Sequence, residues 1–159
     1  MAYVNPTNRS AGELITAARW NQDVVANIQY LKTPPITRLG FTAFNTSSTS
    51  YVPVHETQNI ITTTGGRVLF GAIGTAFQIA SSALSVYLTL YVDGTKLTTA
   101  NDEGLVRVGV PGTAHVHVPW CILYTTGTLT AAMHTFRIYA KVSDGTGYVN
   151  LQHLFLLEI

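Results

Sequence analysis

Two histidines separated by one residue are the first candidates for chemistry. His115 and His117 lie in a segment expected to be extended, so their imidazoles would leave the same strand face, where two such rings can share a metal ion. The simpler interpretation is a pair of polar residues on an outward face, because Val116 and Val118 then point the other way. No nearby Cys, Asp or Glu completes a ligand set, so a metal site here would need symmetry copies around a threefold axis. We therefore predict no metal site within one chain.

The other ionisable candidates for catalysis are isolated. His134 opens a strand after a loop and His153 lies in the apolar phase of the last strand, so a structural role is expected for both. Asp102 and Glu103 are the only adjacent acidic pair. Adjacent side chains in a strand diverge, and a solvated turn explains the pair better than carboxylate-pair hydrolysis or a weak calcium site does.

Serine and glycine motifs add no chemistry. No serine occupies a Gly-x-Ser-x-Gly elbow. Gly65-Gly66 and the Gly71-x-x-Gly74 spacing lack the following helix that a phosphate cradle requires. The sequence therefore predicts that the protein is not an enzyme, has no catalytic residues and needs no cofactor.

Three tyrosines are more informative about binding. Tyr87, Tyr91 and Tyr139 fall on the outward phase of their expected strands. Tyrosine offers a broad contact area at low entropic cost and is enriched in protein interfaces. We predict that these tyrosines contact other subunits; glycan stacking is the alternative.

One helix is expected to position a second contact surface. The segment from Ile15 to Leu31 has a helical period, Thr16 suits the N-cap, and Ile15 and Trp20 have the spacing of a hydrophobic staple. Pro34-Pro35 should end the helix. Its apolar stripe needs a partner surface, either the chain's own β-structure or another subunit, and consists of Ala17, Trp20, Val24, Ile28 and Leu31.

After Pro35 the period of the sequence changes from helical to alternating. We predict strands at Ile36–Phe44, Ser50–Val54, Asn59–Thr64, Arg67–Ile73, Leu84–Asp93, Leu105–Val110, Ala114–Thr125, His134–Val142 and Tyr148–Ile159. The clearest alternation sends Leu84, Val86, Leu88, Leu90 and Val92 inward. No helix separates these strands, which excludes a parallel sheet. The expected fold is mainly β, an antiparallel β-sandwich of jelly-roll or tumour-necrosis-factor-like type preceded by one short N-terminal α-helix. Residues 1–35 would form an arm with an oligomerisation or docking helix, and residues 36–159 the sandwich domain.

Composition favours a protein that assembles with itself. Charged residues make up 11% of the 159 residues and the net charge is +1, which gives no electrostatic basis for binding nucleic acid or an anionic membrane. No apolar stretch is long enough to span a membrane, and the N-terminus lacks the features of a signal peptide. Cys121 is the single cysteine, is expected to be a buried small apolar residue, and fits assembly in a reducing cytoplasm. So few charges would protect a monomer poorly against self-association.

Several segments together resemble the short structural proteins of tailed bacteriophages and related prophages. The opening resembles theirs at Met1-Ala2-Tyr3, Gly12-Glu13-Leu14-Ile15-Thr16-Ala17-Ala18, Asn21, Val24, Asn27 and Leu31-Lys32; later segments do so at Thr62–Leu69, Tyr91–Thr95 and His134–Arg137. One departure is Ala131-Ala132-Met133, where a glycine turn would be expected. The resemblance implies a virion component, a trimer whose helix precedes a jelly-roll-like sandwich.

The sequence thus predicts a bacteriophage virion structural protein, assembled in the host cytoplasm. We expect a homotrimeric fibre-like, tail-tip or capsid-decorating component whose partners are its own copies and other virion proteins. The alternative is a host-receptor or carbohydrate-binding module displayed on the virion, with a host-surface glycan as partner. A glycan depolymerase is a third hypothesis, against which the lack of an acid pair counts.

Overall fold

Two antiparallel β-sheets make up the body of the protein. The structure is a computed structural model that describes residues 16–25, 28, 36–40, 42–54, 57–79, 82–97 and 104–159, without the side chains of residues 23 and 36–39. Its elements are α1 Ala17–Trp20, the π-helical turn η1 Asn21–Val25, β1 Ile36–Leu39, β2 Thr42–Thr46, β3 Val52–Pro53, β4 Asn59–Thr62, β5 Val68–Phe77, β6 Leu84–Val92, β7 Thr95–Lys96, β8 Val106–Val110, β9 Val118–Thr125, β10 Met133–Val142 and β11 Gly147–Glu158.

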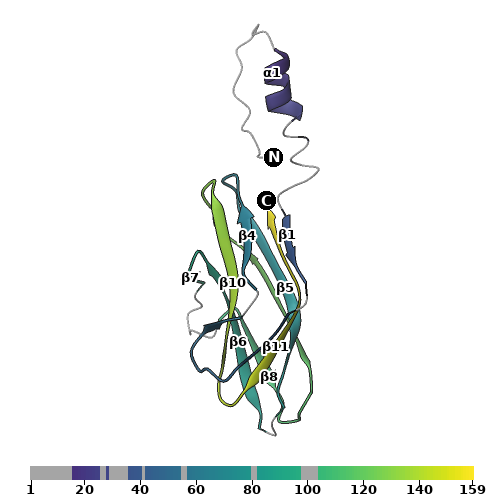
Figure 1. The fold of residues 1–159 in the computed structure, drawn as a ribbon, viewed down its shortest axis with the longest axis vertical. Coiled ribbons are helices and arrows are strands. Elements are labelled where there is room, and N and C mark those ends of the chain that lie inside the picture. Colours follow the sequence, from purple (N-terminus) through teal and green to yellow (C-terminus); the bar gives the residue numbers. More distant parts are fainter. Residues whose placement is uncertain are drawn as a thin grey trace.

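The strands divide between a five-stranded and a six-stranded sheet. In sheet A the order is β1-β11-β5-β9, with β2 also paired to β11; in sheet B it is β3-β10-β6-β7, with β4 paired to β10 and β8 to β6. The long strands run along the long axis of the molecule, and α1 lies beyond the end at which β11 finishes (Figure 1). The predicted mainly β, antiparallel class is confirmed.

Both sheets contribute apolar side chains to one core. The rings of Phe70 in sheet A and Phe136 in sheet B stack with centroids 6.3 Å apart. Burying a large apolar side chain stabilises a fold by roughly 1.5–3 kcal/mol, so this core carries much of the stability. Its largest fully buried apolar members include Phe70, Leu88, Leu90, Phe136, Ile138, Leu151, Leu154 and Leu156.

The alternation predicted for β6 is confirmed with one exception, and β10 alternates in the same way. The even-numbered residues of β6 from Leu84 to Leu90 are buried, and so are those of β10 from His134 to Val142. Thr89 was predicted to face outward, but its side chain is fully buried. The chain after β7 folds back over β6, and the Thr89 hydroxyl donates to the Leu97 carbonyl at 3.0 Å.

A β-bulge in β11 corrects the predicted phase of the last strand. The pairing with β5 shifts register between Leu151 and His153, so two consecutive residues there are exposed. Before the bulge Val149 and Leu151 face the core, and after it Leu154 and Leu156 do. A bulge inserts one residue and reverses the faces of the residues after it. His153, predicted to share the phase of Leu151, therefore points outward.

The prediction for β9 is wrong at its start. The strand begins at Val118 instead of Ala114, and residues 112–115 form a bend and a turn. His115 has a left-handed φ of 62°, and its amide donates to the Gln78 carbonyl at 2.8 Å. Further along, Trp120 and Ile122 are buried as predicted.

The glycine pair between β4 and β5 forms a turn, but the hairpin that Gly65-Gly66 indicates in the sequence is wrong, because β4 pairs with β10 in one sheet and β5 with β11 and β9 in the other. Gly65 has a φ of 103°, a conformation that glycine adopts without strain. One carboxylate oxygen of Glu158 closes the turn, accepting from the amides of Thr64 and Gly66 at 2.7 and 3.0 Å and from the Thr64 hydroxyl at 3.0 Å. Glu158 is only 3% exposed, so this acid at the end of β11 is part of the structure.

The N-terminal helical segment is described in part. The Thr16 side chain accepts from the Arg19 amide at 3.3 Å, which is the predicted N-cap contact. Helical structure follows from Ala17 to Val25, first as α1 and then as η1. Ile15 and Leu31, the ends of the predicted helix, and the Pro34-Pro35 break lie outside the described residues. The division at residue 35 stays a prediction.

Candidate functional site

The two spaced histidines do not share a strand face, although both rings lie near the ring of Phe77. Because His115 lies in a turn and His117 outside β9, the argument that they share a strand face is wrong, and Val116 is 39% exposed instead of inward. His117 lies against Phe77, with ring centroids 4.3 Å apart, and its Nδ1 is 3.2 Å from the Thr75 hydroxyl. Among the described residues no group of three or more His, Cys, Asp or Glu is placed to hold a metal ion.

His134 forms an ion pair that the sequence did not reveal. Its Nδ1 is 2.7 Å from an Asp93 carboxylate oxygen and its Nε2 is 2.9 Å from the Thr130 carbonyl, so each nitrogen faces an acceptor. The hydrogen bond that His134 donates to Asp93 raises the pKa of His134; burial opposes this, while the Thr130 carbonyl and the Asp93 charge add to it. This contact joins β10 to the turn after β6.

Asp93 responds in the opposite direction. Burial alone would raise its pKa, but hydrogen bonds from His134 and from the Thr135 amide, together with the charge of His134, lower it overall. The Thr135 amide donates to Asp93 at 2.8 Å. Asp93 has a φ of 50° at the start of the predicted Asp93-Gly94 turn. All the hydrogen-bond partners in this arrangement are residues of the protein itself, so its role is structural. We call the ion pair of these two side chains the His134–Asp93 clasp.

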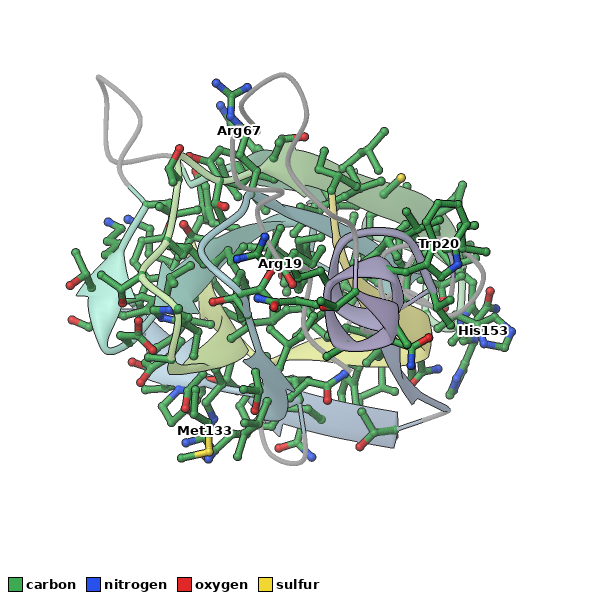
Figure 2. The ribbon with its side chains drawn as sticks, turned by 90° about the horizontal axis from the view of Figure 1, so that it is seen from above. Arg19, Trp20, Arg67, Met133 and His153 are labelled. Carbon is green, nitrogen blue, oxygen red and sulfur yellow. The ribbon has the colours of Figure 1, made fainter. Side chains whose placement is uncertain are left out.

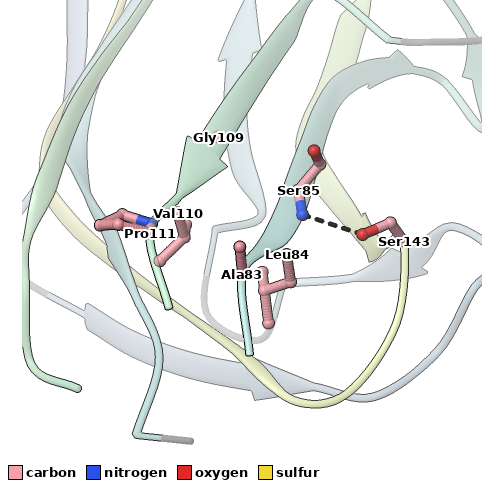
Figure 3. Close-up of a pocket in the computed structure, with 7 residues that line it drawn as sticks. All are labelled: Ala83, Leu84, Ser85, Gly109, Val110, Pro111 and Ser143. Carbon is pink, nitrogen blue, oxygen red and sulfur yellow. Dashed lines mark hydrogen bonds between the residues drawn. The ribbon is translucent and has the colours of Figure 1, made fainter. Parts of the chain in front are cut away.

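A shallow pocket of about 380 Å³ lies at one end of the sandwich. Figure 3 shows that its wall comes from the start of β6, the end of β8 and the loop after β10. Ser143 accepts from the Ser85 amide at 2.9 Å, and the Ser85 hydroxyl accepts from Arg107 at 3.3 Å. None of the seven residues that line the pocket is ionisable, so the pocket offers no base that could activate a serine nucleophile. The lining residues are Ala83, Leu84, Ser85, Gly109, Val110, Pro111 and Ser143. The predicted acidic pair Asp102 and Glu103 lies outside the described residues.

The outer face of sheet A carries an exposed apolar surface. In register, Ile73 of β5 lies between Cys121 of β9 and His153 of β11, and Gly71 in the next row lies between Leu123 and Phe155. Leu123 is 70% exposed and Ile73 is 43% exposed. His153 projects outward from the sandwich in Figure 2. We call this surface the neutral face; its residues are Leu69, Ile73, Cys121, Leu123, His153, Phe155 and Leu157.

Three strands behind the neutral face have almost no charge, and the edge strand β1 adds Arg38, the register partner of Phe155. The 10 residues of β5, the 8 of β9 and the 12 of β11 include one charged residue, Glu158, which is buried. The ring of Phe155 lies over Gly71, where an added Cβ would meet ring atoms at 2.2 and 2.4 Å. Cys121 is exposed on this face, so the prediction that it is buried is wrong. Its neighbours Trp120 and Ile122 point into the core instead.

The outer face of sheet B has the opposite character. Its strands contain four basic residues and no Asp or Glu: Lys96, Arg107, Arg137 and Lys141. The predicted contact residues Tyr87, Tyr91 and Tyr139 lie here, on the sheet opposite the neutral face. Tyr91 and Tyr139 stack with centroids 3.8 Å apart, and burial together with the neighbouring Tyr139 raises the pKa of Tyr91.

Basic groups lie against two other tyrosine rings. Register places Tyr87 between Lys141 and Arg107, and both cations lie near its ring centroid, at 5.2 and 5.5 Å. Tyr51, just before β3, has the ammonium groups of Lys96 and Lys141 at 4.2 and 4.7 Å from its ring centroid. Each contact is within the range of a cation–π interaction. We call these five residues the aromatic–basic row; the sequence indicated Tyr87 as a contact residue but not the cations beside it.

The helical stripe presents a third apolar surface. Trp20 is 52% exposed, Ile28 is 46% exposed and Ala17 is exposed, whereas Val24 is half-buried. No residue of α1 is buried, and Trp20 projects outward from it in Figure 2. The described part of the stripe is therefore not covered by the chain's own sandwich.

Comparisons with known proteins do not assign the chain to a class. No protein-family model matches the sequence, and no curated protein matches it significantly. In the described part of the chain, none of the helices has the length and apolarity needed to cross a membrane. The functional argument therefore rests on the two sheet faces and the helical stripe.

Proposed function

We propose that the protein is a bacteriophage virion structural protein that assembles as a homotrimer through the neutral face of sheet A. The observation that carries this proposal is an exposed, apolar sheet face whose three strands β5, β9 and β11 expose no Lys, Arg, Asp or Glu. Apolar side chains on such a face gain free energy when a second copy covers them. The proposed fold type is a jelly roll, supported by the long strands β5, β6, β9, β10 and β11, which alternate between the two sheets.

A second copy is the occupant that the charges favour. Around a threefold axis, strands β5, β9 and β11 of three copies can meet without removing a charge of their own from water, which is otherwise costly. The charged residue of the edge strand β1 is Arg38, the register partner of Phe155. Two aromatic–basic rows cannot face each other without repulsion among Lys96, Arg107 and Lys141. We therefore expect the copies to contact one another through the outer face of sheet A. The tyrosines Tyr87, Tyr91 and Tyr139 then stay outside the contact between copies.

The helical stripe supports attachment as a second role. Its exposed Trp20 has the size and chemistry of an interface anchor. Residues 1–35 would carry this stripe to a neighbouring subunit or another virion protein. The fibre-like, tail-tip and capsid-decorating positions all require such a contact, and the protein has no catalytic role in any of them.

Analytical ultracentrifugation of matched lysine variants tests the assembly. Leu123→Lys places a charge at the most exposed apolar position of the neutral face, and we expect it to reduce the mass from about three times 17.2 kDa toward 17.2 kDa. Met133→Lys is the control, because Met133 is 67% exposed and belongs to sheet B. A trimer that survives Leu123→Lys, or a monomeric parent at micromolar concentration, would contradict the proposal.

The virion assignment needs a test of its own. An antibody raised against the purified protein should label phage particles produced from the genome that encodes it. Intact particles that lack the chain would refute the virion role and leave the assembly result standing.

A further inference from the structure

We propose that the aromatic–basic row on sheet B binds an acidic polysaccharide. The row consists of Tyr51, Lys141, Tyr87, Arg107 and Lys96 and crosses strands β10, β6 and β8 next to β3. It lies on the sheet opposite the neutral face, so this inference does not depend on the trimer.

The row repeats rings and cations at strand spacing. Lys141 pairs with Tyr87, and Tyr87 pairs with Arg107, so the two cations lie in register two strands apart. With neighbouring strands about 4.8 Å apart, their backbones are separated by roughly 10 Å. A chain whose anionic groups recur every one or two sugar units has charges at comparable intervals, and it would lie across the strands.

The rings hold the cations at the surface. Lys141 lies against both Tyr51 and Tyr87, and Lys96 lies against Tyr51 as well. Loss of hydration and the nearby charge of Lys141 lower the pKa of Lys96. A bound carboxylate would offset this repulsion and accept charge-assisted hydrogen bonds from both ammonium groups.

A polysaccharide fits this chemistry better than single-stranded nucleic acid does. Nucleic-acid sites of this kind stack bases on open aromatic faces. Here Tyr91 and Tyr139 stack on each other, while Tyr51 and Tyr87 have cations against their rings. The net charge of +1 is also much smaller than the positive charge expected for a nucleic-acid-binding domain. Phenol hydroxyls and ammonium groups together suit a ligand with hydroxyl and carboxylate groups.

Titration with three defined polymers tests the proposal. Isothermal titration calorimetry would compare polygalacturonate, which has a carboxylate on each sugar, with neutral dextran and oligo-dT. We expect binding of polygalacturonate that weakens as salt rises, no binding of dextran, and weaker binding of oligo-dT. Absence of polygalacturonate binding at low salt would overturn the proposal, and tighter binding of oligo-dT would replace it with a nucleic-acid site.

Variants of one lysine locate the binding. Lys141→Gln removes the cation that two rings share, and we expect about a three- to tenfold loss of affinity for polygalacturonate. Lys141→Arg keeps the charge and should stay within about twofold of the parent. The control is Arg67→Gln, because Arg67 is exposed on the turn before β5 (Figure 2). Equal losses for Lys141→Gln and Arg67→Gln, at unchanged melting temperatures, would refute the assignment to this row.

Discussion

Single side chains whose partners are far away in sequence close the ends of the sandwich. Glu158 gathers three hydrogen bonds from Thr64 and Gly66 on one buried oxygen. His134 joins Asp93 to Thr130. The contacts of Glu158 with Thr64 and of His134 with Asp93 join segments that are distant in the sequence, so each should contribute to stability without taking part in binding.

Removing the Glu158 carboxylate should destabilise the protein. We expect Glu158→Ala to lower the free energy of unfolding by about 2–3 kcal/mol, because two partly buried amides lose their acceptor. Glu158→Gln keeps an acceptor oxygen and should cost about 1 kcal/mol. Urea denaturation measures both, with the exposed Gln152→Ala as control at within about 0.5 kcal/mol. If Glu158→Ala unfolds at the same urea concentration as the parent, the carboxylate does not hold the turn.

The His134–Asp93 clasp should make stability depend on pH. The folded-state pKa of His134 is raised above 6.5, so its stabilisation is complete below pH 6.5 and is lost as pH rises through the folded pKa. The pKa of Asp93 is lowered from 3.8, so its part is present above pH 3.8 and is lost as pH falls through the folded pKa. Asp93 is 46% exposed, which limits the effect to about 1 kcal/mol or less.

Thermal melts at fixed protein concentration between pH 6 and 9 measure the His134 part. Parent protein should lose a few degrees over this range, by about 2–4 °C per kcal/mol, whereas His134→Gln should change less. An identical pH profile for the two proteins would exclude the clasp as the cause.

At the scale of elements, the sequence predicted the presence of the strands well. It predicted less well the residue at which each strand begins and which of its side chains face the core. The alternation of β6 depends on local chemistry, which the sequence displays directly. The bulge after Leu151 depends on the pairing of β11 with β5. The late start of β9 depends on the hydrogen bond that the His115 amide donates to the Gln78 carbonyl. Cys121 was misassigned because flanking apolar residues do not reveal which phase is buried.

The helical element makes its own prediction. Trp20 is half exposed, so Trp20→Ala should leave the melting temperature of the sandwich nearly unchanged. It should nevertheless weaken assembly or attachment by about 3–5 kcal/mol, as loss of a buried aromatic anchor does. Gln22→Ala, an exposed neighbour, is the control. Sedimentation together with thermal melting measures both quantities. If Trp20→Ala lowered the melting temperature and left assembly and attachment unchanged, the helix would pack on the sandwich of its own chain, which would contradict the prediction.

At the scale of the whole molecule, the outer faces of the two sheets differ in charge: the neutral face of sheet A is apolar, and the outer face of sheet B is basic. The neutral face joins Ile73, Cys121 and His153 from three strands, and only the order β11-β5-β9 brings them together. Local patterns could not predict this surface, nor the cations beside Tyr51 and Tyr87. Composition predicted an assembling protein, and we propose the exposed apolar face as the surface through which the copies meet.

Alkylation of Cys121 tests most directly whether the neutral face is buried between copies. Cys121 lies within this face and is the only cysteine in the chain. Iodoacetamide labelling followed by intact-protein mass spectrometry should find Cys121 protected in the native protein and readily modified in the monomeric Leu123→Lys variant. Rapid, complete modification of Cys121 in a native oligomer, at the same rate as in the variant, would show that the copies meet elsewhere and contradict the account.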